Sequence, residues 1–225
     1  MCLAQNFKLY KMASLNEIGL KHTTDKASST HGYLDTYEKY LGGWQDKEFT
    51  LLEIGVAAGN SLRMWREYFT KARVYGIDNN PDCVGYGEGI FIGSQTDDVF
   101  LDSVLGKIGI PDIIIDDGSH YAPNTIATFK KLFPNISKNG YYIIEDTHCF
   151  YDATYGLAPD YGRGMSEVFN FFSGLASHVD VHGRGMCGDA NFAINHPTTI
   201  PPVPEFSRIL DSMYIHPSLW WFKRK

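Results

Sequence analysis

Short apolar runs alternate with amphipathic segments through the middle of the chain. Five of these runs have the length and the Val, Ile, Leu and aromatic content that are typical of buried strands. They are residues 50–55, 73–78, 89–93, 111–116 and 140–145. Between the first two, residues 60–69 place Leu62, Trp65 and Phe69 at helical spacing. The alternation predicts βαβ units, and therefore an α/β, doubly wound, mostly parallel sheet with helices on both faces.

The same pattern predicts further elements on the C-terminal side. Helices are expected at residues 97–108 and 125–133, the second after Pro123, which suits a first helical turn. Two more strands are expected at residues 212–216 and 218–223, which would complete a seven-stranded sheet.

Two stretches lie outside the alternation. Residues 1–45 are rich in Tyr and are expected to hold one or two helices, and residues 147–190 are rich in Gly, Tyr and Phe, with a helical patch at 166–176. Both could cover the carboxyl ends of the strands, where open α/β sheets bind ligands. We therefore expect an N-terminal helical lid over residues 1–45 and a second region, residues 46–225, that carries the sheet.

Composition and charge narrow the classes of partner. A chain of 225 residues with 44% hydrophobic content can bury a full core. With 26 Asp and Glu against 20 Lys and Arg, the net charge of -6 opposes binding to a phosphate backbone, so no nucleic acid partner is expected. No apolar run approaches membrane-spanning length, so no membrane partner is expected either. Four cysteines without CxxC spacing, and no secretory leader, favour reduced thiols in a cytoplasmic protein.

Two of the predicted strands end on acid pairs. Residues 111–121 read PDIIIDDGSHY, with Asp116 and Asp117, and residues 140–148 read GYYIIEDTH, with Glu145 and Asp146. Neighbouring parallel strands bring these carboxylates to one edge of the sheet, where they repel unless a cation lies between them. A single pair also fits a turn or a helix cap. Two pairs of hard oxygen donors without Cys favour a Mg²⁺ site.

The first predicted strand runs into a helix through small residues, LLEIGVAAGNS. Backbone can approach a ligand at Gly55, Ala57 and Gly59, although a glycine turn that merely packs fits the loop as well. A dinucleotide fingerprint would need G-x-G-x-x-G, which the loop lacks. Glu53 within this strand and Asp78 at the end of the next are stronger signals. An acid at that strand end can accept both hydroxyls of a ribose, and nothing basic beside Asp78 could receive a phosphate, which favours S-adenosylmethionine.

At this point the sequence resembles a known family. The motifs ExGxxxGxS, GID, GSQTD, DIIIDDGSH and GYYIIEDTH, with KHTTDKASSTHGYLDTYEKYL at residues 21–41, are similar to those of metal-dependent class I methyltransferases. The members in question O-methylate sugars on macrolides and related natural products. The resemblance covers about residues 18–148. One departure is His22, where the family more often has Gly.

The resemblance implies a function and a set of site residues. It implies S-adenosylmethionine as donor, Mg²⁺, and a hydroxyl of a small molecule, most simply a sugar moiety, as acceptor, and it allows a homo-oligomer. It implies His120 as general base, a task for which imidazole is the usual side chain near neutral pH. The implied metal ligands are Asp117, Glu145 and Asp146. The implied cofactor-binding residues are Glu53, Gly55, Ala57, Gly59, Ser61, Asp78, Asn79, Gln95, Asp97 and Asp116.

Alternatives stay open at this point. Catechol-type O-methyltransferases share the metal spacing but carry Lys at the base position and Asn as last ligand, so His120 and Asp146 favour sugar hydroxyls. A noncatalytic adenosine- or metal-binding module is a second alternative, and a nucleotide-sugar oxidoreductase is a third. His178 and His182 have zinc-ligand spacing but lack partners. Lys26, His31 and several tyrosines are candidates to line the site; the tyrosines are Tyr33, Tyr37, Tyr151, Tyr155 and Tyr161.

Overall fold

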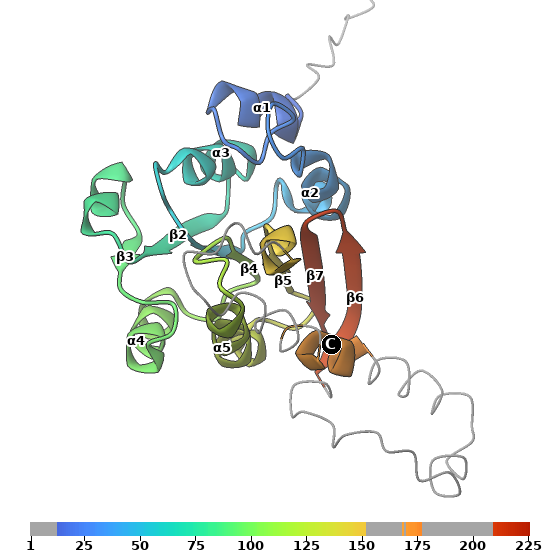
Figure 1. Ribbon diagram of the computed structural model, residues 1–225. Helices are drawn as coiled ribbons and strands as arrows, with labels where there is room; N and C mark the ends of the chain where they lie inside the picture. Colours follow the sequence, from blue (N-terminus) through green and yellow to red (C-terminus); the bar gives the residue numbers. More distant parts are fainter. Residues whose placement is uncertain (1–12, 152–167, 169, 177–208) are drawn as a thin grey trace, which may run out of the picture.

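The computed structural model describes residues 13–151, 168, 170–176 and 209–225. Within these residues, seven strands form one sheet in the order β3-β2-β1-β4-β5-β7-β6 (Figure 1). Neighbouring strands from β3 to β5 are parallel, whereas β7 runs antiparallel to β5 and β6. The strands are β1 (Thr50–Ile54), β2 (Arg73–Asp78), β3 (Ile90–Ile92), β4 (Ile113–Asp116), β5 (Tyr141–Ile144), β6 (Leu210–His216) and β7 (Leu219–Arg224).

Helices cover both faces of this sheet, with α1, α2 and α3 on one side and α4 and α5 on the other (Figure 1). They are α1 (Leu15–Lys21), α2 (Leu34–Leu41), α3 (Asn60–Tyr68), α4 (Asp98–Ile108) and α5 (Ala122–Leu132). Short 3-10 helices lie at Gly42–Trp44, Pro81–Tyr86, Phe133–Asn135 and Thr147–Tyr151. Residues 170–176 are also helical. The predicted seven-stranded, doubly wound α/β fold is therefore confirmed. None of the described helices is long and apolar enough to cross a lipid bilayer.

The predicted elements are present, with small shifts at their ends. α3 ends at Tyr68, one residue early. α5 begins at Ala122 rather than at residue 125, because Pro123 lies in its first turn, where a missing N–H costs nothing. β6 begins at Leu210, two residues before the expected start, because its pairing with β7 extends that far.

Alternate residues of each central strand face opposite sides of the sheet. Leu51 of β1 and Ile113 of β4 lie in the core shared with α1, α2 and α3. Leu52 and Ile114, one residue further on, lie in the core shared with α4 and α5. All four side chains are fully buried. The continuous apolar runs in the sequence thus reflect strands that are covered on both faces.

The described part of the N-terminal segment packs against the sheet. Ser14 and Glu17 form a capping box that fixes the start of α1. Leu34 and Tyr37 of α2 are fully buried in the same core as β1 and β4. The expectation of helices in this segment is confirmed, and these helices form a layer on the sheet. The domain boundary at residue 45 stays a prediction.

The strand order reverses between β1 and β4, because β2 and β3 extend the sheet on one side of β1 and β4 begins the other side. Ligands of open α/β sheets bind outside the carboxyl ends of the strands at such a point. The loops that follow β1 to β5 all open at this edge, and they or the strand ends carry the predicted site residues.

Candidate active site

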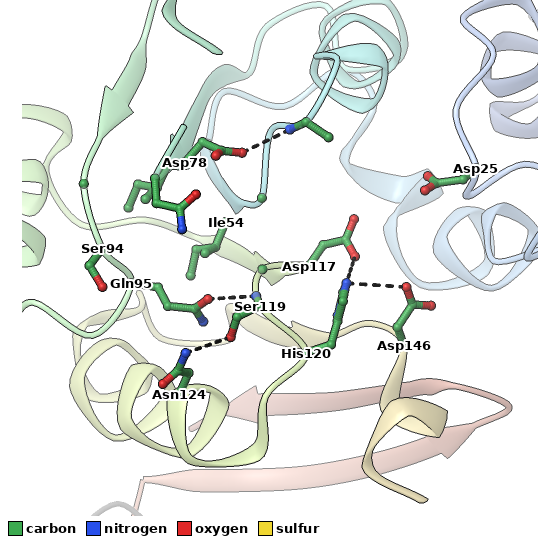
Figure 2. A pocket seen from close by; sticks show the side chains of 16 residues that line it. Asp25, Ile54, Asp78, Ser94, Gln95, Asp117, Ser119, His120, Asn124 and Asp146 are labelled. Atoms are coloured by element: carbon green, nitrogen blue, oxygen red, sulfur yellow. Dashed lines mark hydrogen bonds and ion pairs between the residues drawn. The ribbon is translucent and has the colours of Figure 1, made fainter. Parts of the chain in front are cut away.

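A cavity of about 340 Å³ lies at the carboxyl edge of the sheet, between the loops that follow β1, β2, β3 and β4 (Figure 2). A second cavity of about 200 Å³ adjoins it between the loop after β1 and the N-terminal segment. The two share Asp25, Gly55, Ala57 and Asp117 as lining residues. The geometry describes one elongated site, with Asp78 near one end and Asp117, His120 and Asp146 near the other.

The loop between β1 and α3 brings its backbone close to the site. Gly55 has φ 92°, and a Cβ there would collide with the carbonyl oxygen of Asp117. Gly59 has φ 69° and precedes α3, whose first turn has no side-chain cap. Both positions therefore need glycine for backbone conformation and, at Gly55, for close approach. This is the loop that the sequence pattern predicted to approach a ligand.

Asp78, at the end of β2, is held by backbone amides. Its Oδ2 accepts hydrogen bonds from the N–H of Val56 at 2.8 Å and of Ala57 at 3.1 Å, and its Oδ1 accepts from Asn80 N–H at 2.8 Å. Burial raises the pKa of this carboxyl, but these hydrogen bonds outweigh burial and lower the pKa below its ordinary value. Asp78 is thus a fixed, ionised acceptor on the cavity wall, with lone pairs to spare.

Gln95 and Asp116 form a buried network behind the cavity. Gln95 Nε2 donates to Asp116 Oδ1 at 3.3 Å. Gln95 Oε1 accepts from the N–H of Ser119 at 2.9 Å (Figure 2). Tyr142 donates to Asp116 Oδ2 at 2.8 Å. Burial raises the pKa of Asp116 to about 6, opposed by the Tyr142 hydrogen bond. Asp116 therefore shapes the loop after β4 from beneath, and Gln95 alone of the two lines the cavity.

A buried lysine from the N-terminal segment lies among the strand-end carboxylates. Lys26 Nζ is 2.5 Å from Asp117 Oδ2, 2.8 Å from Glu145 Oε2 and 3.3 Å from Glu53 Oε1, and the lysine is 1% exposed. One ammonium group thus faces a carboxylate within β1 and the carboxylates of the residues that directly follow β4 and β5. These strands are neighbours in the sheet.

The remaining oxygens of two of these acids are also engaged. Glu53 Oε2 accepts from Ser61 Oγ at 2.8 Å, and Glu145 Oε1 accepts from the Tyr37 hydroxyl at 2.5 Å. Burial raises the pKa of Glu53 to about 7 and the pKa of Glu145 well above its ordinary value, and Lys26 opposes both shifts. Burial is the largest cause of both shifts, and the single ammonium group of Lys26, shared among three carboxylates, offsets it only in part.

Asp117, His120 and Asp146 face one another at the open end of the cavity. His120 Nε2 is 3.9 Å from Asp117 Oδ1 and 3.8 Å from Asp146 Oδ2, and it lies between them in Figure 2. One donor atom from each of the three lies within 4.8 Å of the others, close enough to hold a metal ion. Tyr33 donates to Asp146 Oδ1 at 2.5 Å, which leaves Oδ2 turned toward His120.

Uncommon backbone conformations gather around the site. Among the described residues, six that are not glycine have positive φ, and four of these line the two cavities. The four are Thr23, Ala57, His120 and Asp146. Such conformations cost on the order of 1 kcal/mol each, and they persist where surrounding contacts impose them. Here they turn His120 and Asp146 toward the cavity.

The structure separates the predicted site residues into two groups. Those that line the cavities are Gly55, Ala57, Ser61, Asp78, Asn79, Gln95, Asp117, His120 and Asp146. Those that do not are Glu53, Gly59, Asp97, Asp116 and Glu145. Asp97 instead caps α4, since its Oδ1 accepts from the N–H groups of Val99 and Phe100. Glu145 is directed to Lys26 and Tyr37 because these are the nearest donors at its buried position.

Sequence reasoning missed some residues of the site. Some of its other candidates lie outside the described residues. Thr23, Thr24 and Asp25 line the cavities, although only their place in a motif-like N-terminal segment hinted at this. Lys26, which the sequence suggested as a candidate to line the site, is at the centre of the acidic cluster. The suggested zinc ligands His178 and His182, and the lid candidates Tyr155 and Tyr161, lie outside the described residues.

Comparisons with known proteins extend the sequence resemblance. No family model matches the chain. The 8-demethyl-8-alpha-L-rhamnosyl tetracenomycin-C 2'-O-methyltransferase of Streptomyces olivaceus is 35% identical over an alignment of 222 residues, and the match covers 92% of this chain and 54% of that protein. The mycinamicin VI 2''-O-methyltransferase of Micromonospora griseorubida is 31% identical over an alignment of 155 residues, and the match covers 65% of this chain and 39% of that protein. The chain thus spans about half the length, or less, of these relatives.

Solved structures agree on the fold. The MycE methyltransferase from the mycinamycin biosynthetic pathway, in complex with Mg, SAH and mycinamycin VI, matches with a TM-score of 0.74 and 24% identity. The match covers 95% of this chain and 55% of that one. The resemblance to sugar O-methyltransferases of natural-product pathways, predicted from the motifs, is confirmed, as is the class I methyltransferase fold.

Proposed function

We propose that this homologue of the natural-product sugar O-methyltransferases transfers a methyl group from S-adenosylmethionine to a hydroxyl of a small, sugar-containing acceptor with the help of a divalent metal ion. One observation carries the proposal. A single elongated site has a fixed ribose-type acceptor, Asp78, near one end and a histidine between two carboxylates near the other.

The residues present fit the donor. Asp78 is ionised, immobile and exposed to the cavity, as an acceptor for two ribose hydroxyls should be. The loop at Gly55 leaves room that a side chain would fill. Ser94 and Gln95 line the wall next to Asp78 and would face an adenine ring beyond the ribose. Together the two cavities provide about 340 and 200 Å³, the range expected for a cofactor site.

The residues also fit a hard divalent cation in part. Asp117 and Asp146 supply oxygen donors at an open position, which suits Mg²⁺ because it keeps several waters when bound. His120 lies at the same position and could be ligand or base. Glu145 is engaged by Lys26 and Tyr37, so its ligation stays a prediction. When bound, the cation supplies positive charge that acidifies a coordinated hydroxyl.

The chain's own residues would then perform three tasks. Asp78 and the loop at Gly55 hold the donor so that its methyl group points along the cavity. Asp117 and Asp146 orient the acceptor hydroxyl at the open end. His120 Nε2 takes the hydroxyl proton while the methyl–sulfur bond breaks and the methyl–oxygen bond forms. Positioning of the two reactants contributes much of the acceleration, since it replaces an encounter in solution.

The class of the acceptor and the location of the protein in the cell are supported by different observations. The relatives named above act on sugars of tetracenomycin- and mycinamicin-type compounds, which supports a glycosylated natural product as acceptor. A cytoplasmic location is part of the proposal and is supported by Cys83, a cysteine of the described residues that is free and buried. A homo-oligomer also stays a proposal.

The test begins with the donor. S-adenosylhomocysteine should bind in calorimetry and should raise the melting temperature of the purified protein, whereas NADH should do neither. With labelled S-adenosylmethionine, a rhamnosylated polyketide should gain label, EDTA should stop the transfer and Mg²⁺ should restore it. Binding of NADH in place of S-adenosylhomocysteine would overturn the proposal. Methyl transfer at the full rate in excess EDTA would show that the reaction needs no metal ion.

A further inference from the structure

Lys26 combines features that a lysine rarely shows together. It is 1% exposed, it makes close contacts with Asp117 and Glu145, and it lies 3.3 Å from Glu53. It belongs to the N-terminal segment, 91 residues before Asp117 and 119 before Glu145. A buried ammonium group persists only where partners replace its water, so the contact fastens the N-terminal segment to three strand ends.

The contact also selects which acid oxygen faces the site. Both oxygens of Glu145 are engaged, one by Lys26 and one by Tyr37. Of Asp117, only Oδ2 is engaged by Lys26, and Oδ1 is turned toward His120 at 3.9 Å. Among the described residues, Lys26 is the only hydrogen-bond donor to the Asp117 carboxylate, so its ammonium group fixes that orientation. Lys26 therefore acts on the site through Asp117.

The residues just before Lys26 form a wall of the cofactor site. Thr23, Thr24 and Asp25 line the second cavity, and Asp25 also lines the first. In Figure 2, Asp25 lies across the cavity from Asp117, on the ribbon of the N-terminal segment. Asn60 of α3 donates to the carbonyl oxygen of Thr23 at 3.1 Å. If Lys26 left the carboxylates, this wall would lose its strongest anchor.

We propose that Lys26 is a positioning residue that docks the N-terminal segment on the sheet edge and thereby assembles the cofactor cavity and the Asp117–His120–Asp146 cluster in one step. The inference rests on the proposed function, since it assumes that these cavities take the donor and the cation. It adds a coupling: ligand binding at either end requires the same docked state, so loss of docking lowers both affinities.

The substitution Lys26→Met tests this, because methionine fills similar space without the charge. Its affinity for S-adenosylhomocysteine, measured by calorimetry without metal, should fall at least about 10-fold, because only the docked fraction binds. Its affinity for Mn²⁺, measured by electron paramagnetic resonance, should fall as well. Lys39→Met is the matched control: it removes an exposed lysine of α2 and should leave both affinities within about twofold.

The metal measurement separates positioning from simple electrostatics. Removal of a positive charge beside two acids should strengthen cation binding if Lys26 only competes with the metal. Tighter Mn²⁺ binding with unchanged S-adenosylhomocysteine affinity in Lys26→Met would therefore overturn the proposal. A general loss of stability is separated by rescue: n-propylammonium should restore S-adenosylhomocysteine affinity to Lys26→Ala, whereas n-propanol should not. Rescue by neither would also overturn it.

If neither variant folds, hydrogen exchange on the unmodified chain gives the answer. Saturating S-adenosylhomocysteine should slow exchange of backbone amides in residues 21–33 as well as in the loop after β1. Slowing confined to the loop would overturn the coupling. The proposed function fails differently: in that case the unmodified chain binds neither S-adenosylhomocysteine nor Mn²⁺.

Discussion

At the scale of single residues, His120 has the position of a base but also the surroundings of a metal ligand. Its Nε2 lies 3.9 Å from Asp117 and 3.8 Å from Asp146, longer than a hydrogen bond. Its backbone has φ 52°, a conformation that residues other than glycine rarely adopt unless surrounding contacts impose it. The two roles differ in what is lost when the imidazole is removed.

His120→Ala should keep cofactor and metal binding and lose about 10² to 10⁴ in turnover, the usual contribution of a general base. Turnover, S-adenosylhomocysteine affinity and Mn²⁺ affinity should be measured on one preparation. His216→Ala, outside both cavities, is the control and should retain turnover. A parallel loss of Mn²⁺ affinity would identify His120 as a ligand instead.

Asp78 has a narrower role, because three backbone amides already fix its carboxylate. Asp78→Asn should weaken S-adenosylhomocysteine binding by about 1.5 to 3 kcal/mol, the range for a hydrogen bond to a charged group. That corresponds to roughly 10- to 100-fold in Kd, which calorimetry resolves. Asp82→Asn, an exposed neighbour, should bind normally. Equal affinities in the two variants would rule out a ribose contact at Asp78.

At the scale of elements, the expectation that the two acid pairs lie close together depended on the geometry of neighbouring strands, which the structure follows. The acid pairs meet at one edge because β4 and β5 are parallel neighbours. The two members of a pair cannot both face the same way, since successive strand residues alternate. Asp116 accordingly turns to Tyr142, and Asp117 turns to Lys26. Alternation applied to the acid pairs would have predicted this division.

Lys26 was a candidate from the N-terminal segment, but its carboxylate partners had no signal that sequence reasoning could use. The contacts of Lys26 join a polar, non-periodic segment to strand ends 91 and 119 residues away. Neither spacing nor composition encodes such a contact, since lysine is ordinarily exposed. Asp97 is the opposite case. An Asp immediately before a helical pattern is a local N-cap signal, and it was available in the sequence.

The position of Asp97 leads to a prediction for α4. Its Oδ1 accepts from two amides of the first helical turn and does not face the cavity. Asp97→Ala should therefore lower the free energy of unfolding by about 1 kcal/mol, as loss of an N-cap does. S-adenosylhomocysteine affinity should stay within about twofold. Asp98→Ala removes a neighbouring acid that does not cap the helix, and it should lower the free energy of unfolding by less. A large loss of S-adenosylhomocysteine affinity in Asp97→Ala would instead support a cofactor contact.

At the scale of the whole molecule, the buried acids make stability depend on pH. Burial raises the pKa of Glu53 from 4.5 to about 7 and the pKa of Asp116 from 3.8 to about 6. Between the ordinary and the raised values, the folded chain binds more protons than the unfolded chain. Their contribution to stability is therefore full below about pH 4 and is lost as pH rises through 6 to 7. Lys26, whose pKa is raised above 10.5, changes charge outside this window.

Glu53→Gln isolates one part of this dependence, because the other groups titrate alike in both proteins. The free energy of unfolding of the unmodified chain, minus that of the variant, should fall by about 3 kcal/mol between pH 4 and pH 7.5, the equivalent of the Glu53 shift from 4.5 to about 7. Urea unfolding at a series of pH values, without added metal or cofactor, measures this difference. A difference that does not change with pH would mean that Lys26 keeps Glu53 ionised throughout. In that case the attraction between the Lys26 ammonium group and the Glu53 carboxylate would outweigh the effect of burial on the pKa of Glu53.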